Sequence, residues 1–577
     1  MSVIRTILSA RFSKSVKPLI GLNVVKKLST SSNIIDSSFP DVSIPQISIP
    51  EFIYSKCEKY ENLIAAECGI TGRKYTYRDI LRKSKNLAKA LRKKLNLKEG
   101  DVVALLLPNV PEFPIAALGV LHAGLVVTTL NPIYTSEEIS RQLTDSSAKA
   151  IITLIDLYEV ASNSSKLLNK ALPILSIKSS QTQSFPRGAI DFREFTDNSI
   201  DYPEIQPRNA QDVAFLPYSS GTTGLPKGVE LTNYNIVANI CQNSSPHLPI
   251  IEETTSTHQD VIPVVLPMFH IYGFSVNTLF MLSKGTKLVT LPRFTPDDFV
   301  SVLRNHKPHI LFIVPPIVLF LSAHPMVKSE DLHSVRIAFS GAAPLGALDE
   351  QRFVEKAGKS VSVLQGYGLT ETSPTVTAIT VQLKAEKNVY GSIGLPIPNT
   401  SVKVVSIDDH TGTPLGPNST GELLVKGPQV MKGYLNRPED TKNTFLDGWL
   451  RTGDMAYYNE DRVFFITDRL KELIKVKGFQ VAPAELEEII RDFPNVEDAA
   501  VIGVSHPTQG EAPRAYIVPK KNTNVNTKDL EEYFKNKVAH YKHLKGGIAI
   551  VDSIPKNASG KIMRRQLKLE FEASNKR

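Results

Sequence analysis

The 577-residue sequence contains few cysteines and lacks a long apolar run. Its three cysteines are Cys57, Cys68 and Cys241, and no two of them form a C-x-x-C pair. An odd, scattered set argues against a disulfide framework and a zinc site, and favours a reducing compartment. No uninterrupted apolar stretch reaches about 18 residues, so we expect no transmembrane segment.

The formal net charge of +9 is concentrated at the N-terminus. Residues 1–35 hold six basic residues and no acidic residue, which leaves a charge of only +3 for the rest of the chain. This distribution is poor evidence for nucleic-acid binding, and no nucleic-acid partner is expected. The six basic residues are Arg5, Arg11, Lys14, Lys17, Lys26 and Lys27.

The same leader is rich in serine and has apolar residues at helical spacing between Val3 and Leu8. An amphipathic, basic and acid-free leader is typical of a mitochondrial transit peptide. We therefore expect a targeting leader over residues 1–35 and a matrix location; an ordinary basic tail on a cytoplasmic protein is the alternative. The last residues, Ser574 to Arg577, are not an S-K-L type of peroxisomal address.

Buried-strand patterns alternate with helical patterns along the chain. Thr76 and Asp79 have the spacing of a capping box before a helical stretch, and residues 102–107 form a continuous apolar run. This alternation predicts an α/β fold with largely parallel sheets, and the length requires at least two domains. Residues 181–207 are polar and contain prolines, which predicts a surface loop.

The stretch SSGTTGLPKG, residues 219–228, lies between an apolar run at 213–216 and a helical pattern that opens at Thr232. This order predicts strand, loop and helix. Glycines and hydroxyl residues let backbone N–H groups approach a phosphate chain closely. The spacing is not that of a Walker A loop, because Lys227 is followed by glycine. The candidate phosphate ligands are Ser219, Ser220, Gly221, Thr222, Thr223 and Lys227.

Further motifs follow in order: LPMFHIYG at 266–273, SGAAPL at 340–345, QGYGLTE at 365–371, GWLRTGD at 448–454, DRLKELIKVKGFQV at 468–481 and PKNASGKI at 555–562. Together they resemble the adenylate-forming superfamily, which includes acyl-CoA synthetases, coumarate–CoA ligases, beetle luciferases and peptide-synthetase adenylation domains. The resemblance spans roughly Pro50 to Leu567.

The resemblance implies an N-terminal domain over residues 36–468, with mostly parallel sheets flanked by helices and a distorted β-barrel. It implies a small, mobile α+β C-terminal domain over residues 469–577, with its hinge at Lys471. ATP, Mg²⁺ and coenzyme A are the implied cofactors, and a small carboxylic acid is the implied substrate.

The resemblance also assigns roles to individual residues. His270 would lie by the acid's carboxylate, and Tyr272 and Val276 would line the acid pocket. Coumarate ligases have a serine where this chain has Val276, which favours a more apolar acid. The SGAAPL segment would contact adenine and the acyl group through Ser340, Gly341, Ala342 and Ala343.

Nucleotide contacts are expected mainly from QGYGLTE. Tyr367 can stack on adenine, Thr370 can bond the α-phosphate, and Glu371 is an oxygen ligand suited to Mg²⁺, together with Thr223. Asp454 would hold the ribose hydroxyls beside Arg469. The remaining predicted cofactor contacts in this part of the chain are Gln365, Gly366 and, against the coenzyme A phosphates, Arg293.

The resemblance places the other catalytic groups near the C-terminus. Lys561 would bridge the acid carboxylate and the α-phosphate, and Lys475 and Gln480 would enter the site in one of two domain orientations. Lys477 and Gly478 would lie beside the pantetheine arm. The spacing of residues 468–481 fits a basic surface hairpin equally well.

These parts predict an acid–CoA ligase that forms acyl-AMP and pyrophosphate, then acyl-CoA and AMP. The acid would be a fatty or aryl-propenoic acid. A luciferase-like mono-oxygenase and a non-catalytic nucleotide-binding protein stay open as alternatives. Arg462 stands where relatives commonly have glycine, and we expect a local change of turn there.

Overall fold

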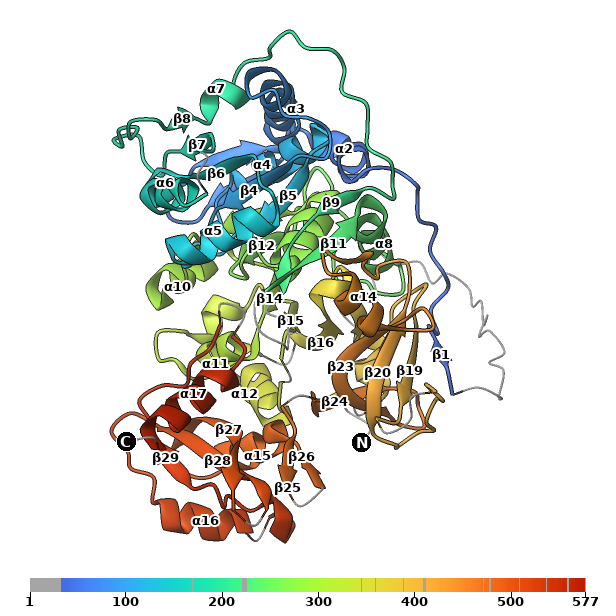
Figure 1. Ribbon diagram of the computed structural model, residues 1–577, viewed down its shortest axis with the longest axis vertical. Coiled ribbons are helices and arrows are strands. Elements are labelled where there is room, and N and C mark those ends of the chain that lie inside the picture. The colour runs from blue at the N-terminus through green and yellow to red at the C-terminus, as the bar shows by residue number, and fades with distance from the viewer. Residues whose placement is uncertain are drawn as a thin grey trace. The chain divides into compact units, whose positions relative to one another are not determined.

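The computed structural model describes residues 33–577 (Figure 1), except residues 169–170, 220–225, 344, 359, 388, 408–410, 471, 477–478, 508, 536, 558–559 and 576–577. The predicted contacts Ser220, Gly221, Thr222, Thr223, Lys471, Lys477 and Gly478 therefore lie outside the described residues, as does the leader up to Ser32. Only the backbone of Gln480 is described.

The first sheet has nine strands and is parallel from β9 to β8. Helices α3 (Tyr77–Lys94), α4 (Phe113–His122), α5 (Ser136–Asp145) and α6 (Tyr158–Lys166) alternate with its strands. The strand order is β10 (Tyr218–Ser219), β11 (Lys227–Thr232), β9 (Val213–Phe215), β5 (Val126–Thr129), β4 (Val102–Leu106), β6 (Ala150–Leu154), β7 (Ile174–Ile177) and β8 (Ile190–Asp191), with β21 (Gly433–Tyr434) on β11.

The second and third sheets combine parallel strands with antiparallel edges. The second runs β12 (Val261–Val264), β13 (Lys287–Thr290), β2 (Ile64–Cys68) and β3 (Lys74–Thr76). The third runs β14 (Ile310–Ile313), β15 (Ile337–Ser340), β16 (Ser362–Gly368), β17 (Thr375–Ala378) and β18 (Leu395–Pro396). Neighbouring helices are α2 (Ile49–Cys57), α8 (Asn233–Asn243), α10 (Pro296–His306), α11 (Pro315–Ala323) and α12 (Ala347–Ala357).

The fourth sheet is antiparallel and corresponds to the distorted barrel that the resemblance predicts. Its path is β1 (Ile35–Asp36), β19 (Ser401–Val405), β20 (Gly421–Lys426), β23 (Trp449–Tyr458) and β22 (Phe445–Leu446), with β24 (Phe464–Arg469) on β23. Alternating side chains of these strands, among them Val402, Val404, Leu423 and Phe464, form a separate apolar core.

Residues 474–575, which we call the C-terminal module, contain the fifth sheet and three helices. The path is β26 (Phe479–Val481), β25 (Ile474–Val476), β28 (Gly510–Pro519) and β27 (Val496–His506), with β29 (Ile548–Ile550) on β28. The helices are α15 (Pro483–Arg491), α16 (Thr527–Lys535) and α17 (Arg564–Asn575). The module has its own apolar core, so the α/β fold class with a separate C-terminal unit of strands and helices is confirmed.

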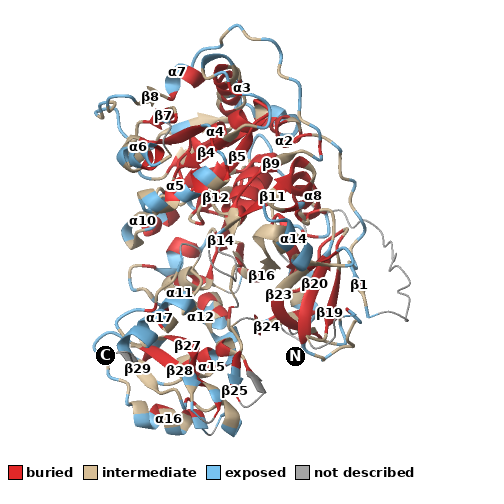
Figure 2. Cartoon of the chain, in the orientation of Figure 1, coloured by how far each residue is buried: buried red, intermediate tan, exposed pale blue. Residues whose placement is uncertain are grey.

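Local signals form as the sequence predicts. Thr76 caps α3 in a reciprocal capping box with Asp79. Gly119 of α4 permits close helix packing, because a Cβ there would lie 2.6 Å from the side chain of Leu87 in α3. Strands of the sheets are largely buried (Figure 2), which matches the apolar run at β4. None of the helices in the described residues combines the length and apolarity needed to span a bilayer.

The strand at 213–215 and the helix that opens at Thr232 form as predicted, but an additional strand, β11, precedes the helix at residues 227–232. Three antiparallel partners, β9, β10 and β21, pair with β11, and β21 lies about two hundred residues away in sequence. Residues 181–207 are not all loop, since they include β8 and the short helix α7 (Arg193–Thr196).

Candidate active site

A buried carboxylate with two donors lies where the third and fourth sheets meet. Asp454 of β23 faces Arg469 of β24 in antiparallel register, and the Arg469 Nε lies 3.1 Å from its Oδ1. The hydroxyl of Tyr367, at the end of β16, donates to Oδ2 at 2.6 Å. Burial and the nearby Asp454 charge raise the pKa of Tyr367 well above its usual value. Asp454 is therefore fixed as an acceptor, as required to hold sugar hydroxyls.

Close packing explains the glycines around Tyr367. A Cβ on Gly366 would lie 2.7 Å from the ring of Phe339, and one on Gly368 would lie 2.0 Å from the carbonyl oxygen of Pro374. Only glycine fits at these two positions without displacing a neighbour. Packing therefore explains the two glycines of the QGYG motif. Tyr367, which lies between them, is half-buried at the edge of the site.

Glu371 is held by a contact that the sequence did not reveal. It lies in the short helix η5 (Thr370–Thr372), and its Oε1 accepts a hydrogen bond of 3.0 Å from the hydroxyl of Tyr434. Its backbone oxygen accepts from the Met431 N–H at 2.9 Å. Thr370 lies half-buried beside it. The other carboxylate oxygen, Oε2, accepts no hydrogen bond from the described residues, so it can bind a cation.

Lys561 of the C-terminal module lies among these charges. Burial, followed by the charge of Arg469, lowers the pKa of Lys561 to about 8, while Asp454 and Glu371 act in the opposite direction. Its turn is closed by hydrogen bonds with Asn557 in both directions. The structure therefore brings the predicted catalytic lysine to the predicted nucleotide groups.

His270 lies next to the same lysine. Burial, and secondarily the charge of Lys561, lower the pKa of His270 to about 4. The imidazole is accordingly neutral at physiological pH and can act as a hydrogen-bond partner without carrying charge. The placement of His270 by the acid's carboxylate stays a prediction.

An apolar cavity lies along the helix that follows His270 in the chain. Its wall includes Tyr272, Val276 and Phe280 of η3 (Tyr272–Phe280), a π-helix, and it encloses about 490 Å³, part of which is open to solvent. Among the described residues, no Asp, Glu, Lys or Arg side chain lines it. The other lining residues are Asn243, Leu248, Pro249, Ile250, Phe312, Phe339, Thr375, Ala378, Ile379, Thr380 and Val381.

The SGAAPL segment lies against the ring of Tyr272. A Cβ on Gly341 would lie 3.1 Å from the Tyr272 ring, so glycine lets the ring lie against the backbone. Ala342 adopts a left-handed backbone with φ of 69°, and Ala343 beside it is half-buried. The buried Oγ of Ser340 has no hydrogen-bond partner among the described residues, which leaves it able to bind a ligand.

Three predicted contacts do not point into this site. The amide of Gln365 exchanges hydrogen bonds with the backbone N–H and C=O of Leu345, so it positions the SGAAPL segment instead of remaining available to a nucleotide. Arg293 is exposed. Lys475 is exposed on β25, and its N–H donates to Glu511. Ser219 has a buried Oγ without a partner among the described residues.

The end of β24 joins the site to the C-terminal module. Asp468 accepts a hydrogen bond of 3.1 Å from the N–H of Ala484 at the beginning of α15, and burial raises its pKa to about 7. Within the module, Arg564 binds Glu487, and it also binds Glu472 in the segment that leads into the module.

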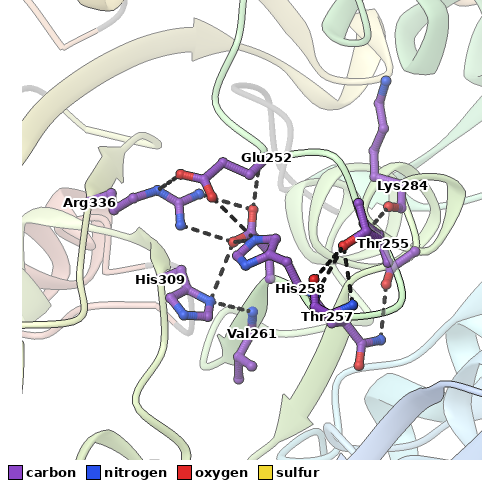
Figure 3. Close-up of polar contacts among 12 residues, drawn as sticks. Glu252, Thr255, Thr257, His258, Val261, Lys284, His309 and Arg336 are labelled. Carbon is purple, nitrogen blue, oxygen red and sulfur yellow. Dashed lines mark hydrogen bonds and ion pairs between the residues drawn. The ribbon is translucent and has the colours of Figure 1, made fainter. Parts of the chain in front are cut away.

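An ion cluster surrounds the buried Asp260 (Figure 3). The fully buried Asp260 accepts two hydrogen bonds of 3.1 Å from Arg336, lies 3.1 Å from His258 and 3.3 Å from His309, and accepts from the Glu252 N–H at 2.9 Å. Glu252 follows the wall residues Leu248–Ile250 by two positions. The cluster therefore anchors one wall of the cavity, and no sequence signal indicated it.

The chain matches two family models. The model described as "AMP-binding enzyme" covers residues 54–435, and "AMP-binding enzyme C-terminal domain" covers residues 485–561. Curated relatives include "Probable 4-coumarate--CoA ligase 1" of Dictyostelium discoideum, 37% identical over 92% of this chain and 97% of the relative. "4-coumarate--CoA ligase 3" of Oryza sativa is 38% identical over 88% and 89%.

Solved structures give the same result. ATP-bound MatB from Rhodopseudomonas palustris is 27% identical, with a TM-score of 0.80, over 92% of this chain and 99% of that one. A benzoate CoA ligase from Burkholderia xenovorans is 25% identical, with a TM-score of 0.79, over 90% and 99%. Because the first family model covers about two thirds of the sequence, this chain belongs to the AMP-binding enzyme family.

Proposed function

We propose that the protein is an ATP-dependent carboxylic acid–CoA ligase that acts through an acyl-adenylate. The observation that carries this proposal is that Lys561 lies close enough to Asp454 and Glu371 for their charges to act on its pKa. A cavity whose described lining holds no charged side chain supplies room for the acid. The matches to curated CoA ligases over most of the chain support the same reaction class.

In the first step, a carboxylate oxygen attacks the α-phosphorus of ATP and pyrophosphate leaves with the electron pair. Both reactants are anions, so cationic and hydrogen-bonding groups must offset their repulsion. Lys561 supplies the cation, neutral His270 supplies a hydrogen bond, and Asp454 with Tyr367 fixes the ribose. Since these groups position and neutralise without bonding covalently, orientation supplies much of the rate.

Magnesium would accompany ATP as part of the substrate. No group of three or more His, Cys, Asp or Glu side chains within the described residues could hold a metal ion, which excludes an all-protein cage there. Mg²⁺ is commonly held by one or two carboxylates together with phosphates and water. Glu371, with Oε1 bonded to Tyr434, fits that mode; Thr223, the other predicted ligand, lies outside the described residues.

In the second step, the thiol sulfur of coenzyme A attacks the acyl carbon of the adenylate, and AMP leaves. Lys561 occupies the site here, so we propose that the C-terminal module turns about Lys471 to let the thiol in. The exposed Lys475, and the backbone near Gln480, would then face the site. The same movement would break the Asp468–Ala484 hydrogen bond.

The cavity favours an acid with a neutral, apolar tail. A second carboxylate or an ammonium group would find no opposite charge on its walls. Val276 lines the wall without a hydroxyl, so a phenolic tail would gain no hydrogen bond from it. We therefore propose a medium- or long-chain fatty acid, or an aryl-propenoic acid.

One incubation tests the reaction and the acid class together. The protein from Ser32 onward, with Mg-ATP, coenzyme A and pooled fatty and aromatic acids, should form new thioesters that are read by mass spectrometry. Lys561→Ala is the matched control and should lose adenylation while keeping thioester formation from supplied acyl-adenylate. AMP and pyrophosphate without thioester would exclude coenzyme A as acceptor, and light emission with luciferin would indicate an oxygenase.

We also propose that residues 1–35 direct the protein to the mitochondrial matrix. The support is the basic, acid-free and serine-rich composition of this leader. A fluorescent protein carrying residues 1–35 should enter mitochondria, and the same fusion with the six basic residues changed to glutamine should stay in the cytoplasm. Cytoplasmic fluorescence from both would contradict the proposal.

A further inference from the structure

Lys227 of the SSGTTGLPKG motif is paired with a carboxylate in the structure. Its Nζ lies 3.0 Å from Oδ2 of Asp440, and 5.2 Å from the centre of the Tyr434 ring. The Lys227 side chain is 16% exposed and that of Asp440 is 39% exposed. The ammonium group is therefore held between an aromatic face and an acid that solvent can reach.

Asp440 belongs to a segment that contacts the strands on both sides of the motif. Residues 433–444 contain β21 and helix α14 (Pro438–Thr444), and β21 pairs with β11, the strand that Lys227 opens. From the same segment, Arg437 binds Asp145 at 3.1 Å, and Asp145 accepts from the hydroxyl of Tyr218 at 2.8 Å. Both strands of the β10–β11 hairpin are thus attached to the segment that carries Asp440.

A lysine that binds a polyphosphate must release any other anion that it holds. The Lys227 ammonium and the Asp440 carboxylate attract each other in the empty site, and phosphate oxygens compete for the same donors. A partly exposed pair of this kind is weak, so a multiply charged phosphate chain can displace it. Breaking the Lys227–Asp440 pair nevertheless makes binding of the phosphate chain less favourable.

We propose that Asp440 is an internal competitor for the phosphates. It occupies Lys227 in the empty enzyme, yields it to ATP, and takes it back as pyrophosphate leaves. The carboxylate thereby weakens binding of both ATP and pyrophosphate and speeds pyrophosphate release. This inference rests on the proposed function, because it assigns Lys227 to the phosphates of ATP.

The test compares two charge-removing variants on one helix turn. Asp440→Asn removes the Lys227 partner, whereas Glu439→Gln removes an exposed charge from the same first turn of α14 and so has the same effect on the helix dipole. Binding of Mg-ATP and of inorganic pyrophosphate is measured by calorimetry, which needs no acid substrate.

Asp440→Asn should tighten both dissociation constants by roughly three- to five-fold and lower the KM for ATP similarly, while Glu439→Gln leaves them unchanged. The gain should shrink at high salt, because the pair is partly exposed. In a Lys227→Met background, Asp440→Asn should have no effect.

Opposite results would overturn the inference. Weaker binding in Asp440→Asn would mean that the acid positions Lys227 for the phosphates, and unchanged binding would mean that the pair has no role. A gain that persists in Lys227→Met would trace the effect to another group. Wild-type protein that binds ATP without making thioester would contradict the proposed function and leave this test intact.

Discussion

Tyr367 and Asp454 lie 87 positions apart in the chain, yet the tyrosine hydroxyl donates a 2.6 Å hydrogen bond to the aspartate carboxylate. The bond links the end of a parallel strand in the third sheet to the middle of an antiparallel strand in the fourth. With Arg469 on the other oxygen, Asp454 has one orientation before any ligand arrives.

We expect Tyr367→Phe to reduce kcat/KM for ATP by about ten- to a hundred-fold. The ring that can stack on adenine is retained, but a hydrogen bond to a buried carboxylate, worth about 1.5–3 kcal/mol, is lost. The measurement is ATP–pyrophosphate exchange with a saturating acid. Tyr158→Phe, whose hydroxyl donates to Arg187 at the surface, is the control and should be unaffected. Equal activity in both variants would show that the orientation of Asp454 does not matter.

We expect the kcat/KM of the adenylation step to fall as the pH rises through about 8. Lys561 has a lowered pKa of about 8, so its ammonium is present below that pH and lost above it. In Lys561→Arg the side chain stays protonated at all accessible pH values, so whatever activity remains should show no such fall. If the activity of both proteins fell at the same pH, the titrating group would be one other than Lys561.

The same lysine should be visible in the titration of His270. The nearby cation helps to lower the pKa of His270 to about 4, so Lys561→Ala should raise that pKa, although burial will keep it below the usual value. The ring signal of isotopically labelled histidine in nuclear magnetic resonance reports this shift directly. An unchanged pKa would show that Lys561 is distant from His270 in the unliganded protein.

Asp260→Asn should lower the free energy of unfolding by about 3–5 kcal/mol, because it leaves the charge of Arg336 without its buried partner. Urea unfolding measures this loss. Glu252→Gln also removes a partner of Arg336, but the Glu252 side chain is 57% exposed, so the loss should be about 1 kcal/mol or less. Similar losses of unfolding free energy in both variants would show that the burial of Asp260 does not determine the size of the effect. Because the cluster anchors Leu248–Ile250, Asp260→Asn should also raise the KM of the acid.

Arg462→Gly should raise the free energy of unfolding by about 0.5–1 kcal/mol. Arg462 has a φ of 61°, a left-handed conformation that costs a residue with a Cβ about 1–2 kcal/mol. Glycine avoids this cost but loses more conformational entropy on folding, so the net gain in stability is smaller. Arg462→Ala removes the same side chain but keeps the Cβ, so it should show no gain. Arg462 thus occupies a conformation that glycine adopts without this cost.

Features set by neighbours in sequence could be predicted. The capping box of Thr76 and Asp79, the buried strand at β4 and the order of strands and helices depend on local patterns, and the structure confirms them. Among the site residues, those carried by compact motifs, Lys561, Asp454 and Glu371, come together as the resemblance predicts.

Features set by distant partners could not be predicted. β11 forms because β9 and β21 pair with it, and no local pattern distinguished KGVELT from the end of a loop. Gln365 looked available to a nucleotide, but its amide is bonded to Leu345. Tyr434 and Asp440 stand in an unremarkable polar stretch, and only the fold brings them to Glu371 and Lys227.

Strand β1 has a practical consequence for any shortened form of the protein. Ile35 and Asp36 pair with Val402 and Ser401, while Pro414 and Leu415 cover the other end of β19. Removing β1 would expose unpaired N–H and C=O groups at this sheet edge, and such an edge invites a second molecule to add its own strand. A form that begins beyond Asp36 should therefore self-associate, whereas one that begins at or before Asn33 keeps the edge covered.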